Sequence, residues 1–373
     1  MTSEAQVDDE LAAYHRPVFD LAPLAAGLRL PLPDEPFVAF WRSLVADATA
    51  RGVWPALADR LPQLAFPIAA GISESPGYRA ATRRGVAVAE IPEATGLELE
   101  RPETLELVLH PTAAGHIPLL IARHRPDFIG LLRALSRRNE PVPVPDGQGA
   151  LMVAGYNNWC RISELKGQWE RSADPDRAAD WNEQFQRLQP HRELYQDRFI
   201  LLSDGPYSAT PAADLGLAEA DWRERSLRLR RDHECAHYFT LRVFGSMRNH
   251  LHDELMADYA GIKGTFGAYR AEWFLRFLGA GEFRRPGRRL DLYRGDPPLG
   301  DVAFARLEGQ VARAAEHLEQ LDRDAPEDPE PFATAWTLAA LATLTLDELA
   351  KDGAPEVLAA RRAALRLSAP ASR

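Results

Sequence analysis

The sequence predicts an α+β protein with a mixed first part and a predominantly helical second part. Short apolar runs of strand length, set between turn residues, occupy much of the chain from Gly85 onward. After Leu217, apolar residues recur with helical spacing almost to the end. We therefore expect a mixed α/β part over residues 1–215 and a helical part over residues 216–373. The 373 residues are enough for one large domain or two of ordinary size.

The composition excludes some classes of partner. Acidic residues outnumber basic ones by 54 to 44, and the net charge is −10. Proteins that bind nucleic acid or anionic membranes through phosphates usually have the opposite balance. The two cysteines cannot form a disulfide framework, and the opening residues lack the apolar core of a secretory signal. We expect a soluble, reduced, cytoplasmic protein; the sequence does not indicate its oligomeric state.

The first clear element is a helix from Asp34 to Arg51. Asp34 can cap its N-terminus, and Gly52 can close its C-terminus. Six apolar residues repeat at the spacing of one buried helical face: Phe37, Phe40, Trp41, Leu44, Val45 and Ala48.

Short strands dominate the rest of the first part. A helix is expected over 127–137 and helical pieces over 163–196, while the turn Asp204-Gly205-Pro206 ends the last strand. The predicted strands cover residues 105–109, 117–121, 150–154 and 198–203.

The second part is predicted to be a series of helices. The weakly polar run 331–346 is shorter than the roughly 20 residues that cross a bilayer, so it predicts a buried helix. The predicted helices cover residues 219–244, 252–262, 268–279, 301–322, 332–351 and 355–367.

Residues 233–237 carry the pattern His-Glu-Cys-Ala-His. On a helix, His233 and His237 lie one turn apart on the same face, where two imidazoles can bind one zinc ion. Glu234 then lies beside the metal-bound water as a candidate general base. Cys235 points away from the ligand face, so ordinary packing is the favoured interpretation.

A catalytic zinc ion needs a third protein ligand. Glu254 and Asp258 share one face of the next predicted helix, so Glu254 can reach the metal while Asp258 orients a histidine ring. His250 and His252 are alternative ligands in the same connection. Asp253 is expected to point away from the metal and to cap the helix.

These residues resemble the active-site core of the gluzincins, the thermolysin-like zinc metallopeptidases. The match covers residues 232–261 and places His233, Glu234, His237, Glu254 and Asp258 on the family pattern. The resemblance implies a zincin-like helix-loop-helix metal site and a strand, 198–203, at the rim of a peptide-binding cleft. Elsewhere, blocks around Ser73, Arg138 and Asp232 look like an uncharacterised bacterial protein family, which implies no substrate.

Several further residues are candidates with weaker support. The stretch from Arg284 to Arg294 contains five arginines, which predicts either a clamp for a substrate anion or, preferably, a solvated loop. Asn157-Asn-Trp159 can line a pocket or form a turn. Donors to a developing oxyanion could come from Tyr207, Tyr238, Tyr259, Arg248 or His250.

The favoured hypothesis is a zinc peptidase or amidase that acts on a peptide or a small amide. His233, His237 and Glu254 bind the ion, Glu234 is the base, and Asp258 orients a ligand. The first alternative is an Fe²⁺-dependent peptide-modifying oxygenase that uses the same ligands. The second is a non-catalytic, metal-stabilised binding protein.

Overall fold

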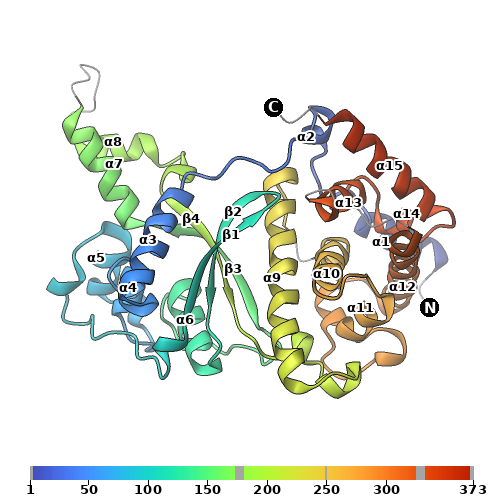
Figure 1. The fold of residues 1–373 in the computed structure, drawn as a ribbon, viewed down its shortest axis with the longest axis horizontal. Helices are drawn as coiled ribbons and strands as arrows, with labels where there is room; N and C mark the ends of the chain where they lie inside the picture. Colours follow the sequence, from blue (N-terminus) through green and yellow to red (C-terminus); the bar gives the residue numbers. More distant parts are fainter. Residues whose placement is uncertain (1–2, 173–179, 248–249, 325–331, 370–373) are drawn as a thin grey trace. The chain divides into compact units, whose positions relative to one another are not determined.

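The computed structural model confirms the α+β class and describes residues 3–172, 180–247, 250–324 and 332–369 (Figure 1). The chain forms two compact units. Unit 1 comprises Met1–Pro33, Thr112–Ala114 and Gly205–Arg373, and unit 2 comprises Asp34–Pro111 and Gly115–Asp204. The N-terminal segment thus belongs with the helical residues after 205. The division of the chain into residues 1–215 and 216–373 stays a prediction.

Unit 2 is built on a four-stranded sheet with the order β1-β2-β4-β3. β2 pairs in parallel with β4, and β3 pairs antiparallel with β4. Gly155 lies at an irregularity in β3 and has φ +78°, a conformation that glycine adopts without a steric penalty. The strands are β1 Glu106–Thr112, β2 Gly115–Ile121, β3 Ala150–Asn157 and β4 Gln196–Leu202.

Helices α3 (Val38–Arg51), α4 (Val53–Ala58) and α6 (Arg125–Ser136) share one hydrophobic core with the sheet (Figure 1). Trp41 and Phe199 are fully buried in it. The predicted start of α3 at Asp34 is wrong. The Asp34 carboxylate instead accepts hydrogen bonds from the backbone and ring of His116. Gly52 ends α3 as predicted.

The remaining helices of unit 2 include α7 (Trp159–Arg171) and α8 (Trp181–Leu188), which project from the rest of the unit (green in Figure 1). They contact each other through Trp169 and Trp181, whose ring centroids are 5.8 Å apart. The other helices are α5 Pro76–Arg84, η1 Pro62–Ala65, η2 Ile72–Glu74, η3 Val88–Glu90, η4 Pro102–Thr104 and η5 Arg192–Leu194.

Unit 1 centres on the pair α9 (Glu219–Phe244) and α10 (Leu251–Phe266). α9 has the predicted bounds and ends at Gly245, which is left-handed with φ +67°. The two helices approach closely at Gly261, where an added Cβ would lie 2.8 Å from the Leu229 carbonyl oxygen. They run antiparallel, because contacts join Leu229 to Gly261, His233 to Asp258, and His237 to Asp253.

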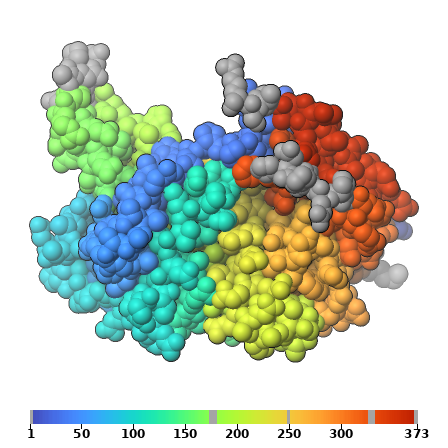
Figure 2. Space-filling model, viewed as in Figure 1, coloured from blue at the N-terminus to red at the C-terminus, as the bar shows by residue number. Residues whose placement is uncertain are grey.

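The other elements of unit 1 surround this pair. The single helix predicted over 332–351 is wrong, because Thr345 and Glu348 form a capping box that starts a new helix. α15 lies at the surface of the unit (red in Figure 2). These elements are α1 Glu4–Tyr14, α2 Ala22–Ala25, η6 Tyr207–Ala209, η7 Ala212–Leu215, α11 Ala271–Leu278, η8 Gly281–Phe283, η9 Arg289–Tyr293, α12 Asp301–Asp324, α13 Ala333–Leu341, α14 Leu346–Leu349 and α15 Ala354–Ser368.

Across the residues that the structure describes, none of the helices combines the length and the apolar character needed to cross a membrane. Cys160 and Cys235 are both free thiols.

Asp197 is expected to be essential for the stability of unit 2. Its buried carboxylate accepts hydrogen bonds from Trp41 Nε1 at 2.9 Å, Asn158 Nδ2 at 2.6 Å and Arg161 Nη1 at 2.5 Å. Asp197→Ala should lower the free energy of unfolding by about 3–5 kcal/mol, because it leaves the buried Arg161 charge unpaired. Denaturant titration followed by tryptophan fluorescence measures the change.

The control is Asp47→Ala, which removes a solvent-exposed ion pair with Arg51 on α3. Because solvent screens that pair, the variant should unfold almost like the wild type. Equal destabilisation by the two substitutions would contradict the role assigned to Asp197.

Candidate metal centre

The two histidines of the motif converge inside unit 1. α9 carries His233 and His237 one turn apart, and their Nε2 atoms lie 3.1 Å from each other. Both side chains are buried. The helix persists through the motif because Trp222 and the apolar residues around it anchor this segment in the core and no glycine or proline interrupts it.

The other ring nitrogen of each histidine contacts a fully buried carboxylate. His233 Nδ1 lies 2.8 Å from Asp258 Oδ1, and His237 Nδ1 lies 3.1 Å from Asp253 Oδ2. A carboxylate at Nδ1 favours the proton on that nitrogen, which leaves the Nε2 lone pair available to a metal. Both rings are therefore oriented as metal ligands require.

Glu254 brings a third ligand atom to the same point. Its Oε2 lies 3.6 Å from His233 Nε2, and its Oε1 lies 3.8 Å from His237 Nε2. Zinc bonds of about 2.0–2.2 Å in a tetrahedron separate neighbouring ligand atoms by about 3.3–3.6 Å. The three side chains thus fit one ion with small adjustments, and together they form a cluster that could hold a metal.

Asp253 does not have the capping role expected from the sequence. It is fully buried, and besides His237 it accepts a hydrogen bond from Thr240 Oγ1 at 3.1 Å. The side chain of His250 caps α10 instead. The angle around α10 alone does not determine the partner of Asp253, because α9 packs along α10. Two histidines one turn apart along α9 meet residues on both sides of Glu254.

Arg289, one of the five arginines of the stretch from Arg284 to Arg294, lies against the same carboxylates. It comes from η9 and donates hydrogen bonds to Glu254 Oε2 and to Asp258 Oδ2, the latter at 2.9 Å. Tyr207, from η6, donates to Asp258 and has its hydroxyl 3.0 Å from His233 Nδ1. Arg289 is distant in the chain from the motif, so no local spacing could have revealed it.

The charges of the cluster shift the pKa values of its members. Burial alone would raise the pKa of Asp258, but the Arg289 charge and the hydrogen bond from His233 lower it to about 2. Burial alone would lower the pKa of His237, but Asp253, with Glu254 and Glu234, raises it to about 10. The site therefore attracts positive charge.

Glu234 is half-buried on α9 beside the histidines, and its charge acts on His237. Among the described residues, its carboxylate has no hydrogen-bond or ion-pair partner. Cys235 is half-buried, and burial raises the pKa of its thiol. A neutral thiol agrees with the packing role expected for Cys235.

The alternative histidine ligands lie outside the cluster found among the described residues. His250 stacks on Tyr14, with ring centroids 4.4 Å apart, and its Nε2 is 3.1 Å from the Tyr14 carbonyl oxygen. His252 is buried near Phe19, and burial lowers its pKa to about 3. Neither imidazole reaches the point where Glu254 meets the other histidines.

The candidate oxyanion donors differ in which groups they contact. Tyr207 has its hydroxyl 3.0 Å from Nδ1 of the ligand histidine His233. Tyr259 donates to Asp322, and Tyr238 is fully buried beside Arg242. Arg248 lies outside the described residues.

The basic stretch is exposed at Arg284 and over residues 286–287 and 291–292, as expected for a solvated loop, and its arginines contact protein groups. Arg284 and Arg288 both pair with Glu308, and Arg294 pairs with Asp301. Arg285 donates to the Ser208 carbonyl at 2.8 Å. These contacts fix the segment that delivers Arg289.

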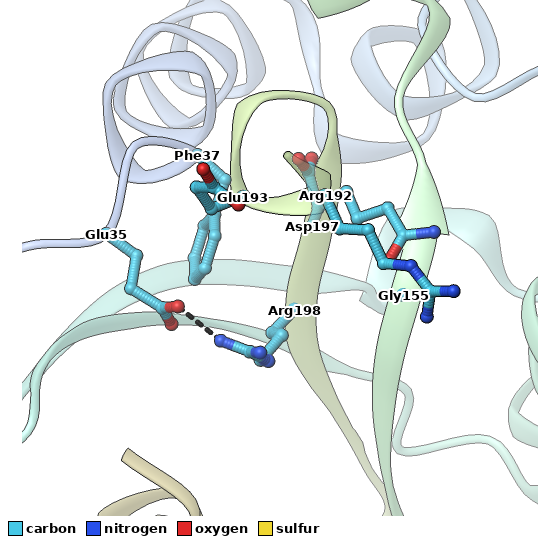
Figure 3. A pocket seen from close by; sticks show the side chains of 8 residues that line it. Glu35, Phe37, Gly155, Arg192, Glu193, Asp197 and Arg198 are labelled. Atoms are coloured by element: carbon cyan, nitrogen blue, oxygen red, sulfur yellow. Dashed lines mark hydrogen bonds and ion pairs between the residues drawn. The ribbon is translucent and has the colours of Figure 1, made fainter. Parts of the chain in front are cut away.

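Unit 2 contains a separate cavity of about 160 Å³, lined among others by Glu35, Phe37, Asp197 and Arg198 (Figure 3). Arg198 pairs with Glu35, so these charges compensate each other. Asn158 caps α7 and donates to Asp197, which favours the turn interpretation of this segment over a pocket.

The expected rim strand exists as β4, one of the two central strands of the unit 2 sheet. The histidines and Glu254 belong to unit 1. A role for β4 in binding a peptide stays a prediction.

Fold and site together define an α+β chain with a buried cluster of two histidines and one glutamate. The sequence matches the model of a family of unknown function, DUF7005, over residues 1–353, and the chain belongs to this family. No curated protein and no solved structure matches the chain.

The two carboxylates behind the histidines should tune metal affinity. Asp253→Ala and Asp258→Ala are each expected to weaken zinc binding on the order of 10–100-fold, because the rings lose the partner that fixes their orientation. Competition with a chromophoric chelator measures the affinity. Asp232→Asn is the matched control on α9, since Asp232 pairs with Arg231 and not with a histidine.

A purely structural role for Asp253 makes a different prediction. Asp253→Ala would then lower the melting temperature and leave zinc affinity at the wild-type value. That result would remove Asp253 from the candidate metal centre.

Proposed function

We propose that this protein is a metal-dependent hydrolase, a zinc peptidase or amidase, with Glu234 as general base. His233, His237 and Glu254 hold the ion. The observation that carries the proposal is the contrast among the carboxylates of the site. Asp253, Glu254 and Asp258 are engaged by histidine or arginine, whereas Glu234 has no partner among the described residues.

The chemistry follows from these roles. A zinc ion, when bound, lowers the pKa of a coordinated water to about 7 and polarises a substrate carbonyl. Asp253 and Asp258 keep the two rings in the tautomer that ligation needs. Glu234 accepts the proton of the attacking water and delivers it to the leaving nitrogen as the amide bond breaks.

Other functions remain as alternatives. A set of two histidines and one carboxylate also suits Fe²⁺, so a peptide-modifying oxygenase would use the same ligands. A non-catalytic, metal-stabilised protein would need the ligands but no base. The uncommitted carboxylate of Glu234 favours hydrolysis over both, because a general base must be free to accept a proton.

The metal content of the protein discriminates between the two enzymes. We expect about one zinc per chain in protein purified without added metal. Elemental analysis measures the metal content. The protein is produced without oxygen, so that Fe²⁺ is not lost by oxidation. Iron in place of zinc would favour the oxygenase hypothesis over the hydrolase hypothesis.

Glu234→Gln should separate metal binding from catalysis. The amide keeps the shape of the side chain but cannot accept a proton, so zinc content should persist while kcat falls on the order of 10²–10⁴-fold. His237→Ala should lose both the metal and activity. A fluorogenic peptide library provides the assay.

Glu224→Gln is the control, because Glu224 is exposed on the same helix away from the cluster. It should behave like the wild type. Full activity in Glu234→Gln would refute the hydrolytic mechanism, whatever the metal content.

A further inference from the structure

Arg289 donates hydrogen bonds to the carboxylates of Asp258 and Glu254, two residues of the candidate metal centre. Its Nη1 binds Asp258 Oδ2, while His233 Nδ1 contacts Asp258 Oδ1. Its Nη2 binds Glu254 Oε2, which also lies 3.6 Å from His233 Nε2, while Glu254 Oε1 lies 3.8 Å from His237 Nε2. One guanidinium thus engages one oxygen of each acid, and the second oxygen of each, Asp258 Oδ1 and Glu254 Oε1, faces a histidine without contacting Arg289.

The guanidinium is itself held in place on several sides. Nε donates to the Tyr293 hydroxyl at 3.0 Å, and Nη1 also lies 3.2 Å from the Tyr207 hydroxyl. Each of its three nitrogens therefore has a protein acceptor, and the side chain is largely buried. Arg289 is fixed by the protein before any ligand arrives.

The backbone beside Tyr207 supports a functional reason for this arrangement. Ser208 and Ala209 have positive φ values of 50° and 54°. Non-glycine residues adopt this conformation at a cost and often near functional sites. Here the strained turn supplies the Tyr207 hydroxyl to Arg289 and Asp258, and the Ser208 carbonyl to Arg285.

We propose that Arg289 is a positioning residue that restricts Glu254 to one ligand oxygen, Oε1. The inference rests on the proposed function of the same site. A carboxylate with both oxygens free can bind a divalent ion through both of them. A charge-assisted hydrogen bond from Arg289 keeps Oε2 engaged and so preserves a position at the metal for water or substrate.

The arrangement also separates this role from binding of a substrate anion. A substrate clamp needs donors that face the substrate, whereas each nitrogen of Arg289 already has an acceptor within the protein. Loss of Arg289 should therefore change how the metal is coordinated and reduce kcat, with little effect on KM.

The test uses the full chain loaded with Co²⁺, whose visible absorption weakens as its coordination number increases. Arg289→Met should bind about one cobalt per chain, lose visible absorption intensity relative to the wild type, and show a kcat on the order of 10–100-fold lower with zinc. Arg306→Met is the matched control, since Arg306 pairs with Asp8 on the surface of unit 1. It should keep the wild-type spectrum.

A milder variant covers the case in which Arg289→Met does not fold. Tyr293→Phe retains the arginine but removes its Nε acceptor, and it should produce a smaller loss of the same absorption. Arg289→Lys keeps the charge and should recover part of the spectrum.

Two results would overturn the inference. One is a wild-type cobalt spectrum in both Arg289→Met and Tyr293→Phe. The other is a rise in KM with an unchanged spectrum, which would assign Arg289 to the substrate. Failure of the proposed function shows elsewhere, as a wild-type protein that binds no metal or as an active Glu234→Gln variant.

Discussion

The close antiparallel packing of α9 and α10 is the constraint on which the candidate metal centre depends. Gly261 permits it, because any side chain there would meet the Leu229 carbonyl oxygen. Backbones held this close let short side chains reach across the interface. Asp253 and Asp258 can therefore touch ring nitrogens while Glu254, between them, points at the space between the two imidazoles. A wider helix pair would leave the same residues without contact.

This packing also concentrates negative charge. Among the described residues, the site gathers four carboxylates, those of Glu234, Asp253, Glu254 and Asp258, against the one guanidinium of Arg289. Buried charges are costly unless they are paired. Burial alone would lower the pKa of His237, but the carboxylates, chiefly Asp253, raise it to about 10. A divalent cation would supply the same compensation more fully, which is why the charge pattern supports a metal.

The sequence predicted the parts of this site that lie on two neighbouring helices; it named Tyr207 and the stretch with Arg289 as candidates but did not predict their contacts with Asp258 and Glu254. α9 formed with the predicted bounds, and Glu254 and Asp258 lie on α10 as expected, because helical periodicity fixes which residues share a face. Arg289 and Tyr207 reach the site through turns whose paths have no periodic pattern. Asp253 was misjudged because its partner depends on how two helices align, which one helix alone does not determine. The predicted start of α3 was wrong for a similar reason. Asp34 binds His116, and this tertiary contact takes the place of a local helix cap.

The distribution of partners among the acids is the main support for the catalytic role that we propose for the site. A structural zinc site usually closes with four protein ligands. Here the cluster found among the described residues supplies three, and the side chains that surround them are committed to holding those three in place. Asp253 and Asp258 fix the rings, and Arg289 occupies one oxygen of Glu254. Glu234 stands beside the ligands without such a partner in the described part of the chain. A site that constrains its ligands and leaves one neighbouring carboxylate without a partner among the described residues suits the proton transfer that we propose for Glu234.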